Sequence, residues 1–223
     1  MFLSQPFKGG ENWDTDPTSG MILDNRSFSS GEKLPYPWFF EGLVRQCLLN
    51  YLKRNSMTHH VFAYGSNMCS GRFRAYGVHP DSAGRSALLT GYRLPFNKES
   101  TDGSGKANLE AQEGSETRGV VYALSDADLR TLDDGEVGYR RVKVPVYLED
   151  NLKVDAWVYI AKQPNNDITL RPYVWYKRFL VEGATEHSLP KEYIAALAQI
   201  EAQNDANERR DRKKRALSCR AES

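Results

Sequence analysis

The sequence predicts an α+β domain, in which short strands form a small, mixed and mostly antiparallel sheet that curls toward a barrel. Two observations predict this class. Valine and aromatic side chains recur at two-residue spacing in many short segments, which is typical of strands. Short segments with helical spacing lie between and after these strands, and this interspersed order favours an α+β architecture.

The expected strands are short, and turn-forming residues separate them. They cover residues 60–64, 86–92, 92–96, 107–111, 119–124, 140–148 and 153–160. Residues 97–105 are rich in serine, glycine and charge, which predicts a flexible loop at the rim of a pocket.

The expected helices cover residues 38–54, 70–76, 125–133, 173–181 and 190–200. Pro37 suits the first turn of the first helix. Ser125 is a good N-cap for the third helix, because its hydroxyl can accept a hydrogen bond from the backbone of a residue such as Asp128.

Three regions follow from these elements. Residues 1–57 are expected to form a loop-rich extension that carries the amphipathic helix at 38–54. Residues 58–204 form the predicted domain. Residues 205–223 are expected to form a basic, disordered tail, because charge runs of this kind are usually solvated. A nucleic-acid partner for this tail is a minor alternative, since no aromatic residues interleave with the charge.

Composition excludes several classes. The chain has 223 residues, of which 40% are hydrophobic and 26% are charged, as in ordinary globular proteins. Its formal net charge of +1 gives no field that favours nucleic acid or acidic membranes. No segment approaches the roughly 20 apolar residues of a membrane span, so we expect no membrane partner.

The three cysteines are Cys47, Cys69 and Cys219, and they are far apart in the sequence. Such a scattered, odd set predicts reduced thiols in a reducing compartment, without a disulfide or a zinc site. The N-terminus lacks a basic segment followed by an apolar one, which predicts no secretory signal. We therefore expect a cytoplasmic protein.

The sharpest local motif lies where the first strand of the domain is expected to end. It reads Phe62-Ala63-Tyr64-Gly65-Ser66-Asn67-Met68. Gly65 permits a turn with positive φ, and Asn67 can cap the helix that follows. Successive backbone amides at such a turn form a nest for an anion. Taken alone, the motif fits an ordinary strand-to-helix turn better.

A second candidate is an acidic turn just after the helix at 125–133. Asp133, Asp134 and Glu136 lie close together there, and Gly135 and Gly138 flank Glu136. A carboxylate that is partly buried beside like charges has a raised pKa, which suits proton transfer. A solvated acidic turn is the simpler interpretation of this segment by itself.

Other chemistries find less support. The four histidines show no metal-ligand spacing, and Ser66 lacks the Gly-x-Ser-x-Gly context of a hydrolase nucleophile. Neither a phosphate-binding loop nor a dinucleotide fingerprint is present. We therefore expect no metal and no cofactor. Cys69 follows the turn closely, but we interpret it as a small packing residue.

Taken together and in this order, the motifs resemble the γ-glutamylcyclotransferase family. The residues that carry the resemblance are the motif at 62–68, Gly119-Val120-Val121-Tyr122, Leu132-Asp133-Asp134-Gly135-Glu136 and Tyr139-Arg140-Arg141-Val142, with Tyr176-Lys177, Gly183-Ala184 and Leu189-Pro190-Lys191-Glu192-Tyr193 further on. The resemblance covers residues 60–204. Met68 stands where the family usually has leucine, which is a mild change.

The resemblance implies a γ-glutamylcyclotransferase-like barrel and an enzyme of the acyltransferase or cyclising lyase type. Its substrate would be a small γ-glutamyl amino acid or γ-glutamyl amine, converted into 5-oxoproline and a free amine. The loop lacks the Gly-Ser-Leu-Ile-Trp sequence of the glutathione-specific branch, which disfavours intact glutathione.

The resemblance also implies a role for each site residue. Glu136 would be the catalytic acid and base, while the loop amides of residues 65–67 would hold the substrate's α-carboxylate or the developing oxyanion. Tyr64 and Tyr139 would orient Glu136 or line the pocket, and Tyr176 would close it or serve as a structural aromatic. A non-catalytic binding module on the same fold is the alternative, and a homodimer stays open.

Overall fold

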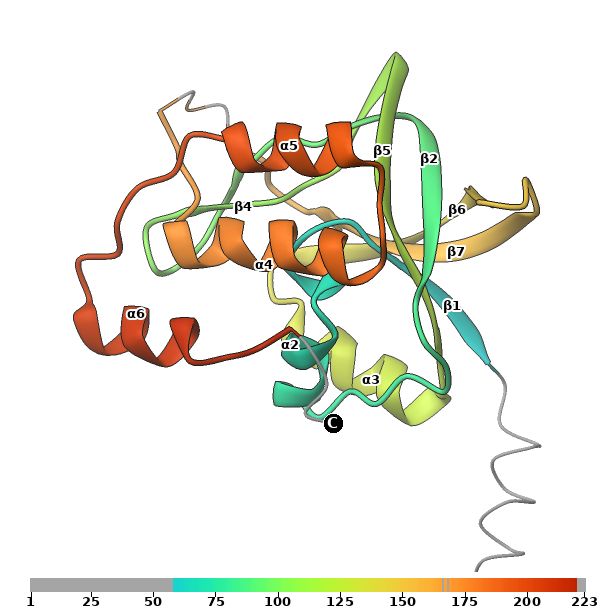
Figure 1. Ribbon diagram of the computed structural model, residues 1–223, viewed down its shortest axis with the longest axis horizontal. Coiled ribbons are helices and arrows are strands. Elements are labelled where there is room, and N and C mark those ends of the chain that lie inside the picture. The colour runs from blue at the N-terminus through green and yellow to red at the C-terminus, as the bar shows by residue number, and fades with distance from the viewer. Residues whose placement is uncertain (1–57, 166, 168, 220–223) are drawn as a thin grey trace, which may run out of the picture. The chain divides into compact units, whose positions relative to one another are not determined.

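The structure is a computed structural model that describes residues 58–219 except 166 and 168 (Figure 1). The helix expected at residues 38–54 therefore lies outside the described residues. No helix in the described part of the chain is long and apolar enough to cross a membrane.

Five strands close a barrel in the order β1-β5-β2-β6-β7. Their bounds are β1 His59–Ala63, β2 Arg85–Arg93, β5 Glu110–Leu124, β6 Tyr139–Leu148 and β7 Lys153–Ala161. β1 pairs with β7 in parallel, and the other neighbours in the barrel pair antiparallel. The predicted α+β class with a mixed, mostly antiparallel barrel is confirmed.

The sequence divided strand β5 incorrectly. It predicts separate strands at 107–111 and 119–124, whereas β5 is continuous over Glu110–Leu124. Most of residues 111–116 are exposed, so their polar side chains show no alternation of buried and exposed positions. The strand expected at 92–96 is also wrong, because β2 ends at Arg93.

Two short strands, β3 (Lys98–Glu99) and β4 (Gly105–Lys106), pair within the loop that the sequence predicts at 97–105. Residues of this loop line a cavity, which confirms that it rims a pocket. The loop is not irregular throughout, since the β3–β4 pair gives it a defined backbone.

The helices lie close to their predicted positions. Their bounds are η1 Ser66–Met68, α2 Ser70–Ala75, α3 Asp126–Gly135, α4 Val174–Glu186, α5 Lys191–Gln199 and α6 Glu208–Arg215. Ser125 caps α3 as predicted, because its hydroxyl accepts a hydrogen bond of 3.1 Å from the Asp128 amide. α4 buries one face completely, including Phe179, Leu180 and Ala184, and Figure 1 shows it beside α5 and α6.

The C-terminal segment differs from its predicted disorder, because residues 205–219 contain α6 and pack on the domain. Acidic residues at helical spacing partner its basic ones: Glu208 pairs with Arg212, and Asp211 pairs with Arg215. The prediction of disorder rested on the basic run, whereas the acids placed four residues before Arg212 and Arg215 stabilise a helix there.

A disulfide joins Cys69 to Cys219, with 4.8 Å between the two Cα atoms. The prediction that all cysteines are reduced is therefore wrong for this pair. The two residues are 150 positions apart, and only the packing of the C-terminal segment against α2 brings them together. Sequence spacing carries no signal for such a contact.

Candidate active site

A cavity of about 470 Å³ lies beside the turn between β1 and α2. This volume is within the range of small-molecule binding sites. Its walls come from this turn, the end of α3, the start of β6, the loop that holds β3 and β4, and helices α4 and α6. The residues that the sequence singled out all line it: Tyr64, Gly65, Ser66, Asn67, Glu136, Tyr139 and Tyr176.

Glu136 ends helix α3, and its amide bonds to the Leu132 carbonyl at 3.0 Å. The side chain points back to the turn after β1, where the Asn67 amide nitrogen donates a hydrogen bond of 2.6 Å to its Oε1. Asn67 in turn accepts a hydrogen bond of 3.3 Å from Nε of Arg72 on α2. Residues far apart in the sequence thus form one polar chain.

Burial raises the pKa of Glu136, while the Asn67 hydrogen bond and the positive charges of Arg72 and Lys98 oppose this shift. The raised pKa agrees with the sequence interpretation, but the proposed influence of neighbouring acids is wrong. Asp133 lies in a separate cluster, where it accepts hydrogen bonds from Tyr159 at 2.8 Å and Arg141 at 2.7 Å.

The expected positive φ of Gly65 is also wrong, since its φ is −114°. Glycine is needed there because of a close approach. A Cβ at this position would lie 3.1 Å from the Ala107 Cβ and 3.2 Å from the Tyr176 hydroxyl oxygen. Gly65 therefore lets the loop after β4 and helix α4 come near the turn.

The turn itself continues into η1, a single 3₁₀ turn in which the Met68 amide bonds to the Gly65 carbonyl at 3.0 Å. The first amides of such a turn have no partner within it. No hydrogen bond from the Ser66 or Asn67 amide to another described residue is present. Asn67 does not cap α2, whose N-cap is Cys69, because its side chain is engaged with Glu136.

Two of the tyrosines hold the backbone of Ala107. The Tyr139 hydroxyl donates a hydrogen bond of 2.8 Å to the Ala107 carbonyl, and the Ala107 amide donates one of 3.1 Å to the Tyr176 hydroxyl. The Tyr64 hydroxyl donates to the Tyr159 carbonyl. Burial raises the pKa of Tyr64, Tyr139 and Tyr176, so these phenols stay neutral.

Within the described part of the chain, none of these tyrosines hydrogen-bonds to Glu136. The residue that orients Glu136 in the structure is Asn67. Tyr139 and Tyr176 instead fix the loop after β4 against the barrel.

The sequence analysis did not predict that Arg72 and Lys106 line the cavity. Arg72 has its Nη1 atom buried without a hydrogen-bond partner among the described residues. Lys106 pairs with Asp102 at 2.9 Å and lies 4.6 Å from the centre of the Trp175 ring. Burial lowers the pKa of Lys106 to about 8. No local pattern in the sequence marked either residue, because Arg72 lies five positions after Asn67, which is not a helical neighbour spacing, and Lys106 belongs to no motif.

Comparison with known proteins places this chain in a family. Residues 116–197 match the model of the AIG2-like family. Human γ-glutamylcyclotransferase is 31% identical over 157 residues, which are 63% of this chain and 77% of the human protein. The bovine γ-glutamylcyclotransferase is 29% identical over 150 residues.

Solved structures agree with these relatives. A structure described as a γ-glutamyl cyclotransferase superposes with a TM-score of 0.62 at 26% identity, over 72% of this chain and all of the other. Fold and cavity define a γ-glutamylcyclotransferase-like barrel. The identity to the human protein and the extent of the match show that the chain belongs to the γ-glutamylcyclotransferase family.

Proposed function

We propose that this protein is a γ-glutamylcyclotransferase, which converts a small γ-glutamyl amino acid or γ-glutamyl amine into 5-oxoproline and a free amine. Family membership supports the reaction. The position of Glu136 in the cavity wall is the observation that supports the assignment of the site. Asn67 holds this carboxylate in the cavity wall, and burial raises its pKa.

The reaction needs little more than orientation and proton transfer. The α-amine of the substrate attacks its own γ-carbonyl carbon, the new C–N bond closes the ring, and the amide C–N bond to the leaving amine breaks. Because the nucleophile is tethered to the carbonyl group that it attacks, holding the substrate in the right conformation lowers the activation barrier for ring closure. The attacking amine loses a proton and the leaving amine gains one.

Glu136 is suited to move that proton. Two carboxylates line the cavity among the described residues, Glu136 and Asp102. Asp102 is paired with Lys106 and has a lowered pKa, so it is a weak base. Glu136 forms no ion pair with another described residue and has a raised pKa, which favours accepting a proton from the α-amine and returning it to the leaving amine.

The loop amides complete the proposed site. The Ser66 and Asn67 amides have no partner among the described residues and line the cavity beside Glu136. In our proposal these amides, with that of Gly65, bind the anion of the γ-glutamyl group, which is its α-carboxylate or the oxyanion formed on attack. Tyr64, Tyr139 and Tyr176 line this end of the cavity and shape it.

The test is substitution of Glu136 by glutamine, which keeps the shape and the acceptor for Asn67 but removes the base. We expect 5-oxoproline formation to fall by about 10²- to 10⁴-fold, with an unchanged circular dichroism spectrum. Asp134→Asn is the matched control, because Asp134 is exposed outside the cavity and should leave the rate unchanged. A Glu136→Gln enzyme with most of its activity would remove Glu136 from the mechanism.

A panel of γ-glutamyl amino acids and γ-glutamyl amines tests the function as a whole. Release of 5-oxoproline by the wild-type chain from at least one of them is expected. If none is turned over while a γ-glutamyl compound still binds, the non-catalytic binding module becomes the better description.

We also propose a cytoplasmic location. Its support is the odd number of cysteines, which leaves at least one thiol without a partner in the same chain. The Cys69–Cys219 disulfide weighs against it, because stable disulfides are rare in the cytosol. Cell fractionation combined with alkylation of free thiols tests the location and the state of this pair together.

A further inference from the structure

Helix α6 supplies one wall of the cavity that contains Glu136. Arg210 and Lys214 line the cavity together with Glu136 and Asn67. The matched family model ends at residue 197, so this wall comes from residues beyond the matched region. The motifs that identify the family therefore say nothing about what the wall does.

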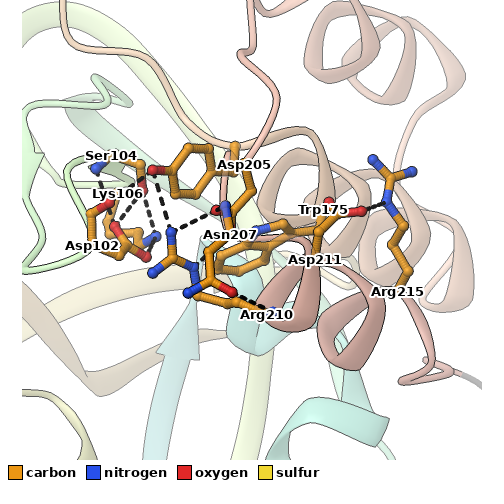
Figure 2. Close-up of polar contacts among 10 residues, drawn as sticks. Asp102, Ser104, Lys106, Trp175, Asp205, Asn207, Arg210, Asp211 and Arg215 are labelled. Atoms are coloured by element: carbon orange, nitrogen blue, oxygen red, sulfur yellow. Dashed lines mark hydrogen bonds and ion pairs between the residues drawn. The ribbon is translucent and has the colours of Figure 1, made fainter.

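The wall is fixed at its first end by a buried carboxylate. Asp205 accepts two hydrogen bonds of 2.6 Å from the Arg210 guanidinium and one of 2.9 Å from the Trp175 indole nitrogen. Figure 2 shows Arg210 beside Trp175, with the Lys106 and Asp102 pair on its other side. The bidentate pair sets the orientation of α6 against α4.

The second end is fixed by the disulfide and by main-chain contacts. The Cys219 carbonyl accepts hydrogen bonds from the Ser70 hydroxyl at 2.9 Å and the Gly71 amide at 3.3 Å. A Cβ on Gly71 would lie 1.7 Å from the Ser218 carbonyl oxygen, so the two segments are in close contact. Between the two ends, Arg178 donates hydrogen bonds to the Lys214 carbonyl at 3.2 Å and the Leu217 carbonyl at 2.8 Å.

With α6 attached in this way, the ammonium groups of Lys106 and Lys214 both lie over the ring of Trp175. Nζ of Lys106 lies 4.6 Å from the centre of the Trp175 ring, and Nζ of Lys214 lies 5.6 Å from it. Asp102 neutralises Lys106. No carboxylate in the described part of the chain forms an ion pair with Lys214, whose ammonium instead lies over Trp175 and Tyr76.

The cavity is therefore positively charged along the wall that α6 provides. Burial is the main cause of the lowered pKa of Lys106, and the nearby charges of Arg72 and Lys214 lower it further, as expected for cations that share one cavity. The buried Nη1 of Arg72 is a further donor without a partner among the described residues. An anion in this part of the cavity would relieve the repulsion and satisfy the donors.

We propose that Lys214 is a specificity-determining residue that binds a carboxylate on the leaving amine, so that the enzyme prefers γ-glutamyl amino acids to γ-glutamyl amines. This inference rests on the proposed function. The loop amides and Glu136 bind the γ-glutamyl part, so the leaving group extends into the rest of the cavity, where Lys214 and Lys106 lie. A polyamine leaving group would meet the like charge of Lys214 there, which no carboxylate of the described residues compensates.

The disulfide makes this preference sensitive to redox conditions. A dithiol reductant gives two electrons and two protons to the Cys69–Cys219 bond, which becomes two thiols while the reductant forms a cyclic disulfide. The C-terminal end of the wall then loses its covalent attachment. Lys214 lies five residues before Cys219, so its ammonium is held less firmly in the cavity after reduction.

The experiment compares γ-glutamylalanine with γ-glutamylalaninamide, which differ only in the leaving-group carboxylate. We expect wild-type kcat/KM to be about tenfold higher for the acid, mainly through KM, because a charge-assisted hydrogen bond is lost with the amide. Lys214→Met should abolish the preference by lowering kcat/KM for the acid to about the value for the amide. Lys213→Met removes the same charge from an exposed neighbour on α6 and should keep the preference.

The possible results distinguish failure of the role proposed for Lys214 from failure of the proposed function. Equal kcat/KM for acid and amide in the wild type, or an unchanged preference in Lys214→Met, overturns the proposal while 5-oxoproline release still upholds the proposed function. Dithiol treatment should reduce the preference of the wild type and leave that of Lys214→Met unaltered. A wild-type preference that does not respond to verified reduction of the disulfide overturns the redox part.

Discussion

At the scale of single residues, Glu136 depends on two neighbours that the sequence separates from it. Asn67 donates a hydrogen bond to its carboxylate, and Arg72 holds Asn67 in place. Burial favours the protonated form of Glu136, whereas both neighbours favour the ionised form. The pKa of this carboxyl group therefore depends on opposing contributions from burial and from its neighbours, and a single substitution can shift it.

The pH profile tests this balance. Glu136 must be ionised to accept a proton from the α-amine, so kcat/KM should fall as pH decreases through its raised pKa. Arg72→Met removes a charge that lowers this pKa, so the acid limb should move to higher pH. Arg72→Lys keeps the charge and should move the limb less. An acid limb that is the same in all three proteins contradicts the coupling.

The same pKa shift has a consequence for stability. A folded-state pKa above the unfolded value means that the folded protein binds the proton more tightly. The contribution of Glu136 to stability is therefore present below its unfolded pKa and is lost as pH rises through the folded pKa. Ionised Glu136 costs stability at neutral pH, which is consistent with a group retained for chemistry.

At the scale of secondary structure elements, the site depends on where elements end. Glu136 stands at the end of α3, Asn67 lies in the single turn η1, and Lys214 lies in the last turn of α6. Such positions place side chains at the rim of the barrel without breaking its hydrogen-bond ladder. The relative positions of these element ends depend on contacts between elements. One of these contacts is covalent, namely the Cys69–Cys219 disulfide.

Reduction of this disulfide should lower the free energy of unfolding by about 2–4 kcal/mol, because the bond closes a long loop and restricts the unfolded chain. Thermal denaturation with and without a dithiol measures the loss. Cys219→Ser should show the reduced stability in both conditions, which separates the disulfide from other effects of the reductant. Equal melting temperatures for oxidised and reduced wild type would contradict the expectation.

At the scale of the whole molecule, the closed barrel needs every one of its strands. β1 joins β5 to β7, so the barrel cannot close without residues 59–63. The buried core also extends beyond the predicted domain boundary at 204. Leu217 packs against this core, and Asp205 and Cys219 are buried. The unit that folds around the site thus extends at least to residue 219.

Two truncated chains test these limits. We expect residues 58–219 to unfold cooperatively and to form 5-oxoproline at the rate of the full chain, because all the described core contacts are present. Residues 58–204 should be less stable by at least about 2 kcal/mol, since the Trp175 indole loses its buried acceptor and apolar packing is lost. Failure of 58–219 to fold would show that residues 1–57 are part of the domain. Equal stability of the two would contradict the packing of α6.

The sequence by itself determined the class of fold, the position of most strands and helices, and seven of the residues that line the cavity. Alternating and helical patterns report which side of an element is buried, and the motifs at 62–68 and 132–136 are local. The cap at Ser125 was predictable for the same reason, because a cap and the backbone amide that donates to it lie within one turn of helix.

Only the tertiary structure decided how these residues act together. It showed that Gly65 is needed for a close approach rather than for positive φ, and that Asn67 binds Glu136 instead of capping α2. It also brought Cys219 to Cys69 and Lys214 to the cavity. These are contacts between segments far apart in the chain, and local patterns hold no information on them because packing of the whole domain sets their distances.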